Sequence, residues 1–204
     1  MRRFVLAFAA LALATALVGS AAGASALERH SVPGEGVSLA VPASWVVVDS
    51  GLTAEAVDRL LRENPKFAPF MQSLRSTTGP TKFIALDPHL RSGFATNVNV
   101  VVTPVASWMT FPVYRRALLL EAGRIATNEI ERKPVTIHGA QAIRLRYQLE
   151  MRLAGKAVTV QTLQYAFLRP ARSIVVTYTT PAALAKPYAA TFARSAATIR
   201  FSGE

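Results

Sequence analysis

Strict alternation of hydrophobic and polar residues marks the last third of the chain. Over residues 141–153, apolar side chains fill every second position and charged or amide side chains fill most of the others; the apolar positions are Ile143, Leu145, Tyr147, Leu149, Met151 and Leu153. This period predicts a strand with one face buried. Turn residues at 154–156 and 169–171 separate it from two further predicted strands, 157–168 and 172–180. Because such tight turns join antiparallel neighbours, the three strands form a meander.

The remaining pattern alternates short strands with helices. We predict a first hairpin over residues 37–48, turning at Pro42-Ala43-Ser44, and strands over 81–87 and 95–103. Helical spacing of apolar residues predicts helices at about 53–63, 112–128 and 185–197, with a short last strand over 198–201. In the second of these helices, Tyr114, Leu118 and Ile125 form the expected apolar side.

A second, shorter helical stripe follows the first helix. Thr53 is suited to cap that helix and Pro65 interrupts it. The stripe then has the spacing i, i+3, i+4 and i+7, at Phe67, Phe70, Met71 and Leu74. Stripes of this kind are typical of a core. An alternative interpretation is that Phe67, Phe70 and Met71 line a cavity for a small apolar ligand.

Together these elements predict an α+β fold with one antiparallel sheet covered by helices. We find no interdomain linker and no internal repeat, so residues 27–204 form one globular domain.

Residues 1–26 have the pattern of a cleavable secretory signal peptide. Arg2 and Arg3 give a positive start, residues 4–18 are uncharged and apolar, and Ala24-Ser25-Ala26 fits a signal-peptidase site. The apolar run is shorter than the roughly 20 residues of a spanning helix. We therefore expect an exported protein, periplasmic or extracellular, with no transmembrane segment after the signal is removed.

Charge and cysteine content refine this picture. The formal net charge is +11, and removing Arg2 and Arg3 from the 23 basic residues leaves 21 − 12 = +9. A basic exported domain is attracted to anionic envelope surfaces or acidic proteins, whereas nucleic acid is a partner that it seldom meets. The chain has no Cys, which excludes disulfides, cysteine catalysis and a lipoprotein anchor.

Three passages resemble the Mog1/PsbP-like superfamily. They are Gly36 to Trp45, with its strand, Pro and Trp; Ile137 to Ala142, where Gly139 leads into a long strand; and the closing Tyr188 to Phe201. The resemblance implies an α/β/α sandwich with an antiparallel sheet, in which members act as binding or assembly factors without a shared catalytic motif. Exported bacterial members include the LpqN-like lipoproteins, from which this chain departs because it lacks the anchoring cysteine.

Motifs for catalysis, cofactors or metals are poorly represented. Arg91-Ser92-Gly93 is the nearest fragment to a serine elbow, and there is no phosphate-binding glycine loop. The histidines, His30, His89 and His138, are scattered, and Asp87-x-His89 is better explained by a turn before Pro88 than by a metal site. We therefore expect no enzyme, cofactor or metal, with a hydrolase as a remote alternative.

One face of the long strand concentrates positive charge. Arg144, Arg146 and Arg152 alternate on it, and Glu150 offsets only one of them. This face is either solvated, with the arginine stems packed on neighbours, or an anion-docking patch. The leading hypothesis is an exported, non-catalytic binding or assembly factor of the cell envelope that acts through protein or anionic-surface contacts.

Overall fold

The computed structural model describes residues 26–49, 52–75 and 81–202, and it omits the side chains of residues 73–75. The expected signal peptide, apart from Ala26, and the side chain of Leu74 lie outside the described residues. The strands are β1 (Leu27–Val32), β2 (Val37–Pro42), β3 (Val46–Val48), β4 (Thr81–Leu86), β5 (Asn97–Pro104), β6 (Glu131–Ile137), β7 (Ala140–Leu153), β8 (Lys156–Arg169), β9 (Arg172–Pro181) and β10 (Arg200–Phe201). The helices are α1 (Ala54–Glu63), η1 (Pro65–Phe67), α2 (Ala68–Arg75), α3 (Phe111–Ile125), η2 (Ala182–Leu184) and α4 (Ala185–Ala196).

The main sheet has seven strands in the order β3-β4-β5-β9-β8-β7-β6, all antiparallel to their neighbours. It contains the predicted meander of β7, β8 and β9. In the β7–β8 turn, both Ala154 (φ 47°) and Gly155 (φ 82°) have left-handed backbone. That conformation matches the twist of a tight hairpin, so this turn fixes the register of the two longest strands.

The predicted hairpin over residues 37–48 is wrong. The turn itself exists, since Trp45 N–H donates to the carbonyl of Pro42 over 2.9 Å. The strands on either side of it, however, belong to different sheets. β2 pairs with β1 and β10 in a small sheet, whereas β3 pairs with β4 at the edge of the main sheet.

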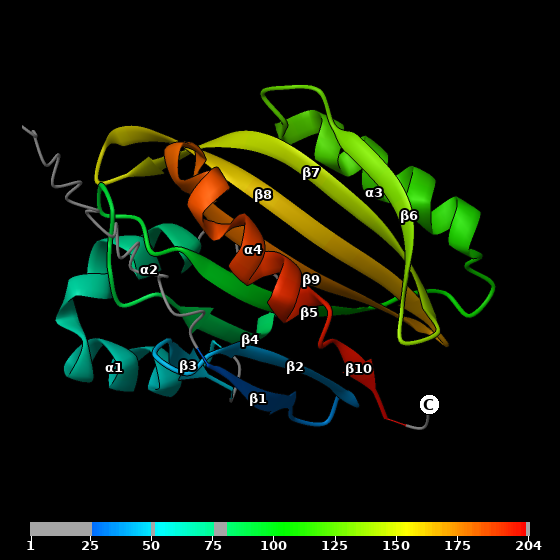
Figure 1. Cartoon of the computed structure of the whole chain (residues 1–204), viewed down its shortest axis with the longest axis horizontal. Coiled ribbons are helices and arrows are strands. Elements are labelled where there is room, and N and C mark those ends of the chain that lie inside the picture. Colours follow the sequence, from blue (N-terminus) through cyan, green and yellow to red (C-terminus); the bar gives the residue numbers. More distant parts are fainter. Residues whose placement is uncertain (1–25, 50–51, 76–80, 203–204) are drawn as a thin grey trace, which may run out of the picture.

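Two layers cover the main sheet (Figure 1). On one face, α4 and the small sheet pack over Phe83, Val100, Tyr178 and their neighbours. On the opposite face, α1, η1 and α2 pack over one end of the sheet and α3 over the other. The protein is therefore an α+β sandwich built on a large antiparallel sheet, as the sequence predicted.

Buried hydrogen bonds and partly exposed ion pairs join these elements. Ser195 on α4 donates to the carbonyl of Ala40 on β2 over 2.5 Å, and its hydroxyl lies 3.0 Å from that of Tyr178 on β9. Glu35, between β1 and β2, forms ion pairs with Lys82 (3.1 Å) and Arg172 (3.4 Å) on the main sheet.

Candidate interaction surface

The basic surface is built at the β6 edge of the main sheet. β6 and β7 are joined by His138 (φ 45°) and Gly139 (φ 81°), a two-residue turn that sets Ile137 opposite Ala140. Counting outward from this turn places Lys133 directly across from Arg144, and Glu131 across from Arg146. Alternate residues share one face of a strand, so all four side chains lie on the face that carries α4.

The pair Lys133 and Arg144 brings two like charges together. Directly opposed side chains on one face of an antiparallel pair have Cβ atoms about 4.5–5.5 Å apart, and like charges there repel. Among the described residues, neither cation forms an ion pair with a carboxylate. Both line an open groove at this edge, together with Glu129, Ile130, Glu131 and Arg132. This arrangement favours an anion between the two cations.

The next two residues on this face already pair with each other, since Arg146 forms an ion pair with Glu131 on β6. Arg144 stands opposite Tyr165 of β8. Burial raises the pKa of the Tyr165 hydroxyl, and the guanidinium of Arg144 opposes that rise. Arg144 thus has the Tyr165 phenol beside it on β8 and Lys133 across from it on the edge strand.

The three arginines predicted as a patch share one face of β7 but are not equivalent. Arg144 is half-buried at the groove, Arg146 is exposed and paired, and Arg152 is exposed near the β7–β8 turn. Eight residues of strand separate Arg144 from Arg152, which is about 26 Å at the usual rise of a strand. The face is also not wholly outward, because Ala140 and Ala142 are buried beneath the α4 layer.

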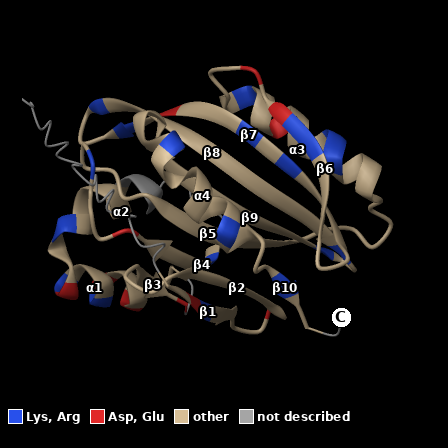
Figure 2. Cartoon of the chain, viewed as in Figure 1, with Lys and Arg blue, Asp and Glu red and all other residues tan. Residues whose placement is uncertain are grey.

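Helix α3 adds further positive charge at the same edge. Pro112 lies in its first turn, which tolerates the missing N–H. Inward side chains, including Tyr114 and Ala122, pack on Ile143 and Leu145 of β7. Figure 2 shows Lys and Arg gathered around α3, β6 and β7. Residues 105–149 carry seven basic side chains against three acidic ones, a balance of 7 − 3 = +4.

The outward side of α3 is partly apolar, which the sequence-based prediction missed. Trp108 is 72% exposed, Leu120 63%, Ile125 51% and Val113 48%. Ile125 was predicted to face the core, and this is wrong. Apolar residues surround α3 on nearly all sides, so its pattern alone does not reveal which of them meet the sheet. The sequence feature that could have indicated this surface is Trp108, which lies just before the helix and outside every predicted element.

The residues predicted to line an apolar cavity pack into the core. Phe67 and Phe70 are 0% exposed and Met71 is 1% exposed. They contact α1 and the β3–β4 end of the sheet, and the ring of Phe70 meets that of Phe94 edge-on at 5.0 Å between centroids. These three side chains therefore present no surface to an open cavity.

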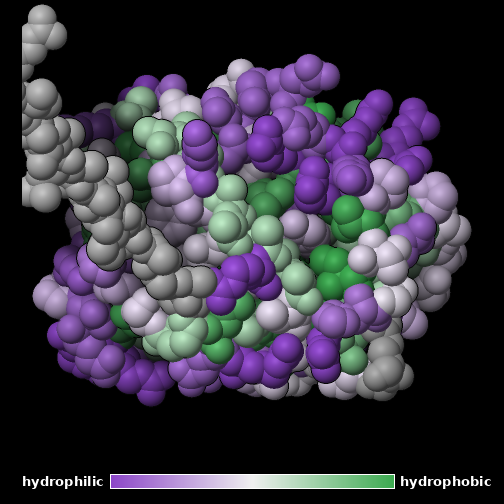
Figure 3. All heavy atoms as spheres, in the orientation of Figure 1, coloured by the Kyte–Doolittle hydropathy of each residue, from purple (hydrophilic) through white to green (hydrophobic). Residues whose placement is uncertain are grey.

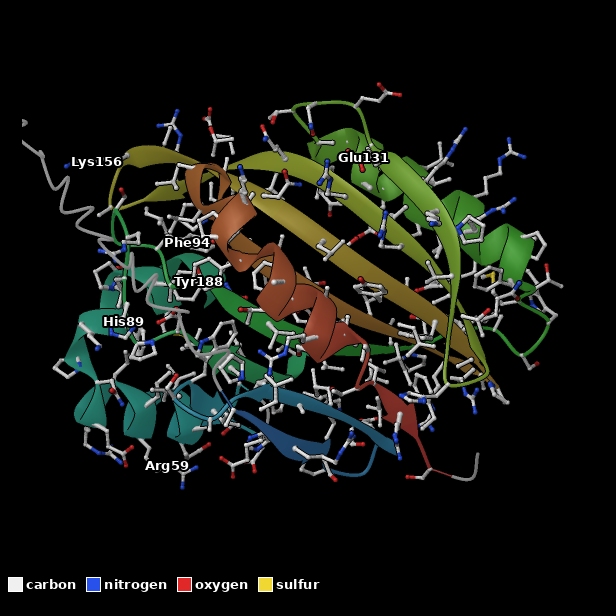
Figure 4. The ribbon with its side chains drawn as sticks, viewed as in Figure 1. Arg59, His89, Phe94, Glu131, Lys156 and Tyr188 are labelled. Atoms are coloured by element: carbon white, nitrogen blue, oxygen red, sulfur yellow. The ribbon has the colours of Figure 1, made fainter. Side chains whose placement is uncertain are left out.

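Asp87 and His89 cooperate to fix a turn. Oδ1 of the buried Asp87 accepts from the backbone N–H of His89 over 2.8 Å and lies 2.9 Å from its Nδ1, while Oδ2 accepts from the Tyr188 hydroxyl. Figure 4 shows His89 and Tyr188 near each other beside Phe94. Within the described ranges, no three His, Asp or Glu side chains group closely enough to hold a metal ion.

Ser92 belongs to a hairpin turn. Arg91 and Phe94 exchange both backbone hydrogen bonds at 2.9 Å, and Ser92 (φ 53°) and Gly93 (φ 76°) form the left-handed pair between them. This is the geometry of a two-residue β-turn, which explains the backbone at Ser92 without a catalytic role.

The scaffold and this surface define an α+β domain with a basic edge. Neither protein-family models nor curated protein sequences match this chain. Several solved structures align with it, and two of them show the fold over most of both chains. Cyanobacterial PsbP (CyanoP) from Synechocystis sp. PCC 6803 aligns with a TM-score of 0.53 and 14% identity, covering 90% of this chain and 96% of that one. LpqN, described as involved in cell envelope biogenesis of Mycobacterium tuberculosis, aligns with a TM-score of 0.51 and 10% identity, covering 85% of this chain and 90% of that one.

At these identities the likeness concerns the fold. The chain has the Mog1/PsbP-like fold that the sequence resemblance predicted. None of the helices among the described residues is long and apolar enough to span a membrane.

Proposed function

We propose that the protein is an exported, non-catalytic binding factor of the cell envelope that holds an anionic component at its β6–β7 groove. The observation that carries this proposal is the placement of Lys133 opposite Arg144, with no carboxylate of the described residues paired to either. Two adjacent cations in a groove give an anion charge-assisted hydrogen bonds, and the fixed fork of an arginine suits a phosphate or carboxylate.

Three other features support the envelope as the place of action. The first 26 residues have the composition of a signal peptide, and the chain without them carries a formal charge of 21 − 12 = +9. LpqN, one of the solved proteins that share the fold, is described as involved in cell envelope biogenesis. Figure 3 shows hydrophilic side chains along the β6–β7 margin and a mixture of hydrophobic and neutral ones over the middle of this face, around α4.

The binding test uses the exported protein and immobilised polyphosphate as an anionic probe. We expect Lys133→Ala/Arg144→Ala to lower the affinity about tenfold at low salt. Hydrogen bonds to charged groups contribute about 1.5–3 kcal/mol each, and solvent and salt weaken them in an open groove. The matched control is Arg59→Ala/Arg62→Ala on α1, which removes the same charge at the opposite end of the molecule (Figures 1 and 4). Equal losses in both variants would mean that the groove has no special role.

The remaining arginines provide a graded comparison. We expect Arg152→Ala to change polyphosphate affinity no more than the control does, since Arg152 is remote from the groove on β7. Arg146→Ala should have an intermediate effect, because Glu131 already neutralises Arg146 and would be released into the groove. A dominant effect of Arg152 would move the anion site to the β7–β8 turn and contradict this assignment.

Export is tested separately from binding. Expression of the full chain followed by envelope fractionation and N-terminal sequencing of the product should give a protein that begins at Leu27. Retention of the full-length chain in the cytoplasm would contradict the export part of the proposal and leave the anion test unaffected.

A further inference from the structure

One stripe on the outward side of α3 alternates apolar and cationic side chains, and the exposed Glu121 lies beside it. Val113, Arg116, Leu120 and Arg124 follow one another at intervals of three or four residues, so they form one stripe along the helix. All four are exposed. Trp108, the most exposed of the large hydrophobic residues described, precedes the helix at the same end of the molecule.

The apolar residues of this stripe, Val113 and Leu120, do not pack in the core. Other side chains of α3 already bury the helix against β7 and β8, among them Tyr114, Leu118 and Ala122. An exposed Trp before the helix, followed along the helix by an exposed Val and an exposed Leu, favours an interaction surface over an ordinary solvated helix. None of Arg115, Arg116 and Arg124 forms an ion pair among the residues that the structure describes.

We propose that this α3 surface, defined by Trp108, Val113, Arg116, Leu120 and Arg124, docks on a lipid bilayer that contains anionic headgroups. A helix lying in the headgroup region places its apolar side chains at the acyl boundary. The guanidinium groups of Arg116 and Arg124 extend to the phosphates on flexible stems. Trp108 matches the interface as well, because its ring is apolar and its N–H is polar.

Charge complementarity favours a bilayer over a protein partner for this surface. A protein would need acidic side chains placed in register between apolar ones to meet the alternation at Val113, Arg116, Leu120 and Arg124. In a fluid layer of anionic headgroups, lipids can move to match this alternation, so no fixed register is needed. A second copy of this chain would set the same arginines against one another, which costs free energy.

This proposal goes beyond the anion groove, because α3 and the Lys133–Arg144 pair lie on opposite faces of the sheet. The α3 surface can therefore be altered while the groove is kept intact. Its occupant is an assembled membrane surface, whereas the groove takes a single anionic group.

The chain has two Trp residues, which makes fluorescence a direct readout of docking. Trp45 is 8% exposed in the core and Trp108 is 72% exposed on the proposed surface. We expect vesicles of phosphatidylcholine with phosphatidylglycerol to shift the emission to the blue, and lipids with brominated acyl chains to quench it. Vesicles of phosphatidylcholine alone should do neither at the same concentration. Trp108→Phe should abolish the shift while leaving the emission of Trp45.

Partitioning into the same anionic vesicles, measured by co-sedimentation, tests the other members. Leu120→Ser should lower the partition coefficient about tenfold, since the side chain would no longer remove apolar surface from water. Arg116→Ala and Arg124→Ala should each lower it about fivefold. Arg59→Ala/Arg62→Ala is the charge-matched control for the two arginines together. Because all of these side chains are exposed, thermal melts should show that every variant stays folded.

Three results would overturn the proposal. The first is a Trp emission that stays unchanged when the protein binds anionic vesicles. The second is a partition coefficient that Leu120→Ser does not lower. The third is a blue shift that appears without lipid as the protein concentration rises, which would identify a second copy as the occupant. Loss of polyphosphate binding in Lys133→Ala/Arg144→Ala with intact vesicle docking would leave this inference standing and confirm that the two surfaces are separate.

Discussion

The hydroxyl of Tyr188 on α4 donates a hydrogen bond to the carboxylate of Asp87 at the end of β4, 101 positions earlier in the chain. The other oxygen of Asp87 accepts from the backbone of His89. One buried carboxylate thus fixes both the turn after β4 and the start of the last helix.

Removing this carboxylate should destabilise the fold. We expect Asp87→Ala to lower the free energy of unfolding by about 2–4 kcal/mol, because it leaves the Tyr188 hydroxyl and the His89 N–H without their acceptor. Urea unfolding followed by circular dichroism measures the change. Tyr188→Phe removes only one of these hydrogen bonds and should cost about half as much. If Tyr188→Phe proves as costly as Asp87→Ala, the bond to the turn contributes little.

Tyrosine environments predict a loss of stability at alkaline pH. Burial and the neighbouring Asp87 carboxylate raise the pKa of Tyr188 to about 12, and burial with the charge of Glu121 raises the pKa of Tyr147 to about 12. An unfolded tyrosine titrates near pH 10. Between about pH 10 and 12 the folded state keeps protons that the unfolded state has lost, so the free energy of unfolding falls as pH rises.

The measurement is a series of urea unfolding curves from neutral pH to above pH 10, with tyrosinate absorbance recorded in parallel. We expect constant tyrosine-linked stability below about pH 10 and a steady loss above it. Tyr188→Phe should flatten the slope, because phenylalanine does not titrate. A tyrosinate titration of the folded protein in which every tyrosine has its midpoint near pH 10 would contradict the buried environments described here.

The long strands could be predicted from the sequence because their information is local. Alternation over 141–153 and two-residue turns on either side are sufficient to specify β7, β8 and β9. The partners of β2 could not be read in this way. β2 pairs with β1 before it and with β10 at the far end of the chain, so its pairing depends on tertiary packing over many residues.

The two candidate surfaces differ in the same way, because one follows from local sequence and the other depends on tertiary packing. The arginines of β7 were visible as an alternating row, but the like-charged pair needed the register across the β6–β7 turn. That register was available in the sequence, since His138-Gly139 is a hairpin turn that sets Lys133 opposite Arg144 once the strands are counted outward. The exposed face of α3 was not available, because a helix with apolar residues on every side does not show which of them meets the sheet.

The core around α2 predicts a large cost for truncating an aromatic ring. Phe67 is 0% exposed and packs among Ile84, Phe94 and the residues of α1. Phe67→Ala should lower the free energy of unfolding by about 3–5 kcal/mol, the range found for buried aromatic residues. Chemical denaturation measures this, with the exposed neighbour Lys66→Ala as a control. A cost below about 1 kcal/mol would indicate that this region can collapse or holds a ligand-sized space.

Ser195 offers the last test, because its hydroxyl joins three elements, α4, β2 and β9, at one point. It donates to the carbonyl of Ala40 in the small sheet and meets the hydroxyl of Tyr178 in the main sheet. Ser195→Ala leaves both groups buried without this partner, so it should cost about 1–3 kcal/mol of unfolding free energy. Tyr178→Phe in the same background should then cost less than it does in the wild-type chain, since its partner is already absent. Urea unfolding of the two single variants and the double variant measures this coupling. Strictly additive effects would mean that the two hydroxyls stabilise their layers independently.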